Sequence, residues 1–358
     1  MESSTATSDA TPRRRAAAGN ALQTAARPSW ARLVIGYLAI AAVVPYLTLK
    51  VLWILGSTAG ILAPSPLDPA VVQNGNLATV AMELIAVGII LTFTHSWGLR
   101  VPACLVLVPA WIGIGLLAPF IVNGPAVAGS VLTEVSPAGD GSLAPWVGPL
   151  VYLGFGAQAI GVTASFVLYV RDRWDRVLIM RLSDRRAYPS DDALRFLGWG
   201  GIAGLLIAVS VARLSWGLGA TWRLSPDLIQ DRGVPERLAD GIAAVFAAAA
   251  LVGLLMLTRR APRRWRVWAP LSLAWVGGGA TLASGLYSLV LLTLRLASST
   301  VQAQQAGLDP IVDLIQVVAG TALGATGAIL LSELHQTGRH VPAAPERAAD
   351  PVRHTRRG

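Results

Sequence analysis

The sequence predicts an all-α, polytopic integral membrane protein: eight transmembrane helices in two tandem four-helix repeats, with both termini in the cytoplasm. Three observations lead to this prediction. Of the 358 residues, 54% are apolar and 14% are charged, which is too little charge to solvate a globule of this size. Eight apolar runs have the length of a membrane span, and the basic residues gather in alternate connections between them.

The spans follow from the length of each apolar run. A helix of about 20 residues, rising ~1.5 Å per residue, crosses a hydrocarbon core ~30 Å thick. Pro102, Pro109 and Pro119 interrupt the third run, but neighbouring helices can satisfy the carbonyls that a proline frees inside a membrane. The predicted spans cover residues 31–56, 77–97, 101–123, 146–170, 196–219, 238–258, 267–294 and 310–332.

The basic residues predict the orientation, because Lys and Arg near helix ends remain on the cytoplasmic side of a membrane. With the N-terminus inside, 23 of the 29 basic residues fall in inner segments and 3 fall in outer loops. The outer loops 57–76, 124–145 and 296–309 contain none. This asymmetry predicts a multi-pass protein of the inner (plasma) membrane, with the lipid bilayer as its surroundings.

Polar segments divide the chain. Residues 1–29 and 336–358 are polar and uneven in composition, so we expect disordered cytoplasmic tails on either side of a membrane domain, residues 30–335. An Arg-rich cytoplasmic linker, residues 171–195, separates the two halves of that domain. Within the linker, the apolar stretch Val177–Met180 predicts a short helix at the membrane surface.

The two halves resemble each other at a nearly constant spacing. KVLWILGST at residues 50–58 matches RLSWGLGAT at residues 213–221, at an offset of 163. PLVYL at residues 149–153 matches PIVDL at residues 310–314, at an offset of 161. Since each unit has an even number of spans, the two units would be related by a pseudo-two-fold axis along the membrane normal, as in parallel-repeat transporters. The predicted repeats cover residues 30–170 and 196–335.

Charged residues occur at one depth inside the spans. Lys50 and Arg213 each lie six residues, or about 9 Å, below the outer end of a span. Two acidic residues and an amide of other spans fall in the same outer half of the membrane, and Asp240 lies just under the outer surface. The candidate site residues are therefore Lys50, Glu83, Arg213, Asp313 and Gln316.

Two explanations of this charged layer remain open. Lys and Arg side chains near helix ends extend to the headgroups, and carboxylates can form structural ion pairs with them. In that case we expect Lys50 to pair with Glu83, and Arg213 with Asp313. Alternatively, the layer lines a polar cavity that opens to the outside and binds a small anionic ligand.

Three classes of function are compatible with these features. The first is a non-enzymatic permease-like or ligand-binding protein, with its polar site in the outer half of the membrane where the repeats meet. The second is a membrane scaffold or regulatory subunit that binds a protein partner through residues 171–195 and the tails. The third is a lipid-modifying enzyme with Glu83 or His95 as a base, although no catalytic motif is present.

Several other classes are excluded or receive no support. No basic face interleaved with aromatic residues appears, so we do not expect nucleic-acid binding. Cys104 is the only cysteine, which rules out a disulfide framework, and no residue spacing predicts a metal or a cofactor. Lys50 is the only lysine among the 29 basic residues, a bias typical of GC-rich genomes such as those of actinobacteria.

Overall fold

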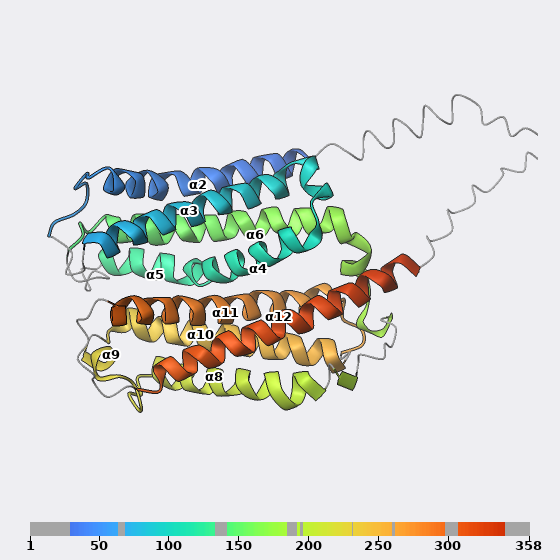
Figure 1. The fold of residues 1–358 in the computed structure, drawn as a ribbon. Helices are drawn as coiled ribbons and strands as arrows, with labels where there is room; N and C mark the ends of the chain where they lie inside the picture. Colours follow the sequence, from blue (N-terminus) through green and yellow to red (C-terminus); the bar gives the residue numbers. More distant parts are fainter. Residues whose placement is uncertain are drawn as a thin grey trace, which may run out of the picture.

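The computed structural model describes residues 29–63, 69–132, 142–184, 192–193, 196–230, 232–259, 262–297 and 307–340. Within these ranges the chain is helical and contains no β-strand, apart from two isolated bridges. The predicted tails lie outside the described residues, except for Ser29 and residues 336–340 at their inner edges. The long helices run roughly side by side (Figure 1).

Eight helices are long and apolar enough to cross a membrane, which confirms the predicted number of spans. The first four spans are formed by α2 (Trp30–Ile54), α3 (Pro69–Thr94), α4 (Ala103–Leu117) with α5 (Phe120–Leu132), and α6 (Val147–Ile179). The last four are formed by α8 (Ala203–Gly217) with the π-helix η3 (Leu197–Ile202), α10 (Val234–Arg259), α11 (Trp268–Ala297) and α12 (Asp309–His340). Short helices connect them: η1 (Ser96–Arg100), η2 (Leu182–Asp184) and α9 (Pro226–Gln230).

The third span is broken at one of the three prolines that interrupt its apolar run. α4 ends at Leu117, and the next helix starts from the Pro119 carbonyl, which accepts hydrogen bonds from Val122 and Asn123. Ala118 keeps an α conformation, with φ −55° and ψ −39°, but Pro119 has no N–H to continue the helical hydrogen bonds. Pro109 lies inside α4 without ending it, which shows that position and neighbours decide the outcome.

The start of the linker that follows α6 is packed against the rest of the chain. α6 is broken by a kink at Trp174, where the backbone is not helical, and a short helical segment follows as far as Ile179 with Met180 as its C-cap. The predicted short helix at Val177–Met180 thus corresponds to the segment after the kink. Met180 and Leu182 are buried with residues of α10, of α12 and of the loop before α11. Residues 185–191, the middle of the predicted linker, lie outside the described part.

The eight spans pack as two groups of four, drawn one above the other in Figure 1. The first group contains α2 to α6, the second contains α8 to α12, and the main contact between them is α4 against α11. Gly115 of α4 lies so close to the Gly279 carbonyl that a Cβ on Gly115 would overlap it. Nearby, the Trp111 indole donates to the Trp275 carbonyl at 2.8 Å. Small residues thus let the two backbones approach closely.

The C-terminal ends of α2 and α8 have the same local structure. Each ends in a glycine with positive φ, 88° at Gly56 and 99° at Gly219, which is the usual left-handed end of a helix. In each, the N–H of the next residue bonds to a carbonyl five positions back. In each, a Trp indole bonds to a carbonyl six positions on, Trp53 to Ala59 and Trp216 to Trp222.

Candidate functional site

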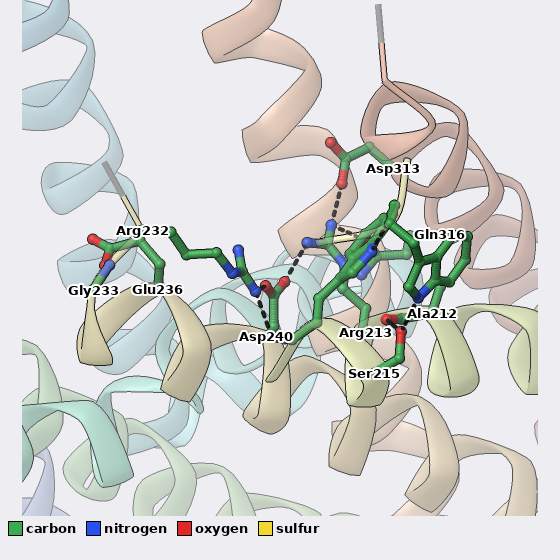
Figure 2. A network of polar contacts seen from close by, with 11 residues as sticks. Ala212, Arg213, Ser215, Arg232, Gly233, Glu236, Asp240, Asp313 and Gln316 are labelled. Atoms are coloured by element: carbon green, nitrogen blue, oxygen red, sulfur yellow. Dashed lines mark hydrogen bonds and ion pairs between the residues drawn. The ribbon is translucent and has the colours of Figure 1, made fainter. Parts of the chain in front are cut away.

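Arg213 lies at the centre of a polar network inside the second group of helices (Figure 2). From α8, its guanidinium forms an ion pair of 2.7 Å with Asp240 of α10 and a second ion pair with Asp313 of α12. Nε and Nη2 also donate to the Gln316 side-chain oxygen, at 3.1 Å and 2.7 Å. The pairing of Arg213 with Asp313 was expected from their depth, and the structure contains it.

A second arginine completes this charge cluster, which comprises Arg213, Arg232, Asp240, Asp313 and Gln316. Arg232, in the loop before α10, pairs with Asp240 and donates to the Trp216 carbonyl at 2.7 Å. From the sequence, we expected Arg232 to be an ordinary outer-loop charge and Asp240 to lie just under the outer surface. The ion pair between Arg232 and Asp240 depends on how the loop before α10 folds back, and the bounds of a predicted span do not reveal the path of a loop.

The charge cluster is electrically balanced. Two guanidinium groups face two carboxylates, and each carboxylate has at least one arginine partner. Charges removed from water are stabilised only when they are paired and hydrogen-bonded in this way. The cluster therefore holds α8, α10 and α12 together, and among the described residues each of its charges has a partner of opposite sign. Two of its buried donors, Arg232 Nε and Gln316 Nε2, have no hydrogen-bond partner in the described part of the chain.

Lys50 lies near the C-terminal end of α2, as Arg213 does in α8, but it has a different environment. Its ammonium donates to the Asn76 side-chain oxygen at 2.8 Å and lies over the rings of Tyr46 and Trp53, at 5.2 Å and 4.9 Å from their centroids. No carboxylate pairs with it among the residues that the structure describes. The expected pair with Glu83 is therefore replaced by an amide and two aromatic faces.

Glu83 is a buried carboxylate without a cationic partner in the described ranges. It lies on α3 with 6% of its surface exposed, and it accepts a hydrogen bond of 2.8 Å from Gln158 of α6. Gln158 itself is 2% exposed. Seven residues, about 10 Å along the helix, separate Glu83 from Asn76, so Glu83 lies deeper in the membrane than the Lys50 ammonium.

The first group contains a polar column that consists of five side chains: Tyr46, Lys50, Asn76, Glu83 and Gln158. Tyr46 lies one helical turn deeper than Lys50 and is buried against Phe155, with ring centroids 4.8 Å apart. Buried polar side chains within a membrane bundle typically mark a binding site or a path for ions. Tyr46, Asn76 and Gln158 were not among the residues predicted from the sequence. Asn76 could have been found from its spacing, because it follows Lys50 by 26 residues much as Asp240 follows Arg213 by 27.

The five candidate residues therefore form two separate sets. Arg213, Asp313 and Gln316 lie within the second group, whereas Lys50 and Glu83 lie within the first. Neither set lies at the contact of α4 with α11, where we expected a shared site. Helix depth predicts which residues are level with one another, but the rotation of each helix decides which of them meet.

At the opposite end of the first group, where α2 begins and α3 ends, polar residues close the bundle. Arg32 is buried; it donates to the Phe93 carbonyl at the end of α3 and pairs with Asp172 at 2.9 Å. His95, one of the two candidate bases, lies beside the Tyr37 hydroxyl at 3.4 Å. An arginine on the last carbonyls of a helix is a common means of capping it, so the contacts of Arg32 are structural.

Within the described ranges, no three His, Cys, Asp or Glu residues gather as a metal site would require. No protein-family model, no curated protein and no solved structure matches this chain.

Proposed function

We propose that the chain is a non-enzymatic, permease-like or ligand-binding protein of the inner (plasma) membrane, whose site is the polar column of the first group. The protein consists of two four-helix repeats with both termini in the cytoplasm. The charge cluster of the second group serves stability, and the polar column serves a ligand with an anionic group.

Equivalent features at similar offsets support the repeat. The matching ends of α2 and α8 are 163 residues apart, as are their Trp indole contacts. Trp111 and Gly115 of α4 contact Trp275 and Gly279 of α11, each pair at an offset of 164. A pseudo-two-fold axis brings equivalent residues of two units together in this manner. The excess of basic residues in alternate connections favours a cytoplasmic N-terminus. Because each repeat has four spans, the C-terminus then lies on the same side.

One observation carries the functional assignment. At the repeat offsets of 161 to 164, Tyr46, Glu83 and Gln158 correspond to Val209, Ala247 and Ala319. These three apolar residues are all 0% exposed and belong to one hydrophobic cluster. The same fold is thus packed with apolar side chains in the second group. Because burying polar groups is unfavourable, their presence in the first group is best explained by a function.

Lys50 provides the recognition of an anionic group. Its ammonium carries three N–H donors, and the structure uses one of them on Asn76. The two aromatic rings beside it hold the ammonium in place without neutralising it. Arg213, at the equivalent position, is neutralised by Asp240 and Asp313. The first group therefore presents a positive charge in the outer half of the membrane.

The test measures the thermal unfolding midpoint of the protein in detergent with a panel of small carboxylates, phosphate and sulfate. At about 100 times its Kd, a ligand stabilises the folded state by ~2.7 kcal/mol, so we expect at least one anion to raise the midpoint by a few degrees. Lys50→Met should abolish this shift, whereas Lys50→Arg, which keeps the charge, should retain it. An equal shift in Lys50→Met would contradict the assignment.

A further inference from the structure

We infer that Glu83 is a proton-binding site, at which the buried carboxyl takes up a proton from the outer side and releases it again. The inference rests on the proposed function, because it assigns a role to the deep end of the polar column. It adds an ion to the ligand that Lys50 would hold.

The surroundings of Glu83 favour a carboxyl group that can be neutral. An ionised carboxylate in an apolar interior carries a very large desolvation cost, and such a group is stabilised by a cation, by several donors or by taking up a proton. Glu83 has one donor, the Gln158 amide, and no arginine or lysine within ion-pair distance among the described residues. Asp240 and Asp313, by contrast, have arginine partners.

The helices that pack against α3 contribute few titratable groups near Glu83. α2 contributes Tyr46 and, one turn further out, Lys50; α6 contributes Gln158, which does not titrate. The titratable residue of α4 is Cys104, which is exposed at the inner end of that helix. In η1, Arg100 is exposed at the inner surface. Lys50 is thus the cation on the outer side of Glu83.

The chemistry of the site suits a proton better than a metal ion. Hard cations in proteins are held by several oxygen ligands, among them carboxylate and amide oxygens. Gln158 instead presents its N–H to the Glu83 carboxylate. A single carboxyl with one amide donor is enough to bind a proton, since a protonated carboxyl keeps an acceptor oxygen for that donor.

The polar column also offers a route to the outer surface. Tyr46 links the two ends of the column, because it interacts electrostatically with Glu83 and its ring centroid lies 5.2 Å from the Lys50 ammonium. Lys50 in turn bonds to Asn76 near the outer end of α2. Apolar residues of the first hydrophobic cluster, including Ile90 and Phe93, bury the same helix on the inner side. The proton is therefore exchanged with the outside.

Carbodiimide labelling tests this inference on the full-length protein in native membranes. Dicyclohexylcarbodiimide reacts with protonated carboxyl groups in apolar surroundings, and peptide mass spectrometry locates the adduct. We expect labelling at Glu83 that decreases from mildly acidic to mildly alkaline buffer. Asp240 and Asp313 are internal controls that should not react, because their arginine partners keep them ionised. Gln158→Met should extend the labelling to higher pH, since the ionised carboxylate loses its one donor.

A second readout covers the case in which the reagent does not reach the site. Infrared spectra of wild type and Glu83→Gln should differ by one protonated carboxyl band that disappears as the pH rises. Absence of both the label and the band would overturn the inference, as would a band that does not change with pH. Protection from labelling by sodium chloride at constant pH would assign the site to a cation instead.

These outcomes are separable from the proposed function. Labelling of Glu83 should persist in Lys50→Met, because the two residues do not contact each other. If Lys50-dependent stabilisation by an anion is observed and Glu83 never reacts or titrates, the proton inference alone is wrong.

Discussion

Replacing Arg213 by Met should lower the free energy of unfolding by about 3–5 kcal/mol, the largest effect that we expect from any single substitution in this protein. The reason is that Asp313 would lose its arginine and Asp240 would keep only Arg232. Both carboxylates are largely buried, so they would be left partly or wholly uncompensated. Thermal or denaturant unfolding of the purified protein in detergent measures the loss.

Two variants make this prediction specific. Arg213→Met combined with Asp313→Leu removes one charge of each sign and keeps the Arg232–Asp240 pair, so it should recover much of the stability. Lys50→Met is the matched control at the equivalent position, and it should cost less, because no buried carboxylate loses a partner. Equal losses for Lys50→Met and Arg213→Met would show that the two positions do not differ as described.

Gly115→Ala should produce the second largest loss, about 1–3 kcal/mol or more, because the added methyl group meets backbone atoms that cannot move aside. The Cβ would overlap the Gly279 carbonyl at the contact between the two groups of helices. The unfolding midpoint in detergent is the readout.

Gly113→Ala is the control for this substitution on the same helix. A Cβ on Gly113 meets no atom within 4 Å, and alanine is favoured over glycine in a helix by about 1 kcal/mol. This variant should therefore be unchanged or slightly more stable. If Gly115→Ala were as stable as Gly113→Ala, that result would contradict the close approach of the α4 and α11 backbones.

Hydropathy predicts the spans well because each helix must satisfy its own backbone and present apolar side chains to lipid. The eight predicted spans correspond to eight helices of suitable length and composition. Pro102, Pro109 and Pro119 were all expected to interrupt the third run, yet α4 continues through Pro109 and ends before Pro119, as α2 continues through Pro45. Whether a proline breaks a span depends on neighbouring packing, and the sequence of one segment does not contain that information.

The candidate site was predicted in part, and the failures have a common cause. The predicted depth of each residue within its span put Arg213 level with Asp313, and the structure contains an ion pair between them. Depth also suggested that Lys50 pairs with Glu83, but these residues lie on α2 and α3 at different heights and bond to Asn76 and Gln158. Asparagine and glutamine carry no charge, so a search for charged residues inside spans passes over them.

We propose that the buried polar groups of the first group are kept for function and not for stability. The most direct measurement is the unfolding midpoint of Glu83→Met/Gln158→Met, in which apolar side chains of similar length replace the pair. Replacing buried charged groups by well-packed apolar ones is often neutral or stabilising by ~1–4 kcal/mol, and in the proposed repeat the buried residues Ala247 and Ala319 correspond to this pair. We predict an unchanged or raised midpoint together with the loss of carbodiimide labelling. A marked fall in the midpoint would mean that Glu83 and Gln158 are structural, and it would contradict the account.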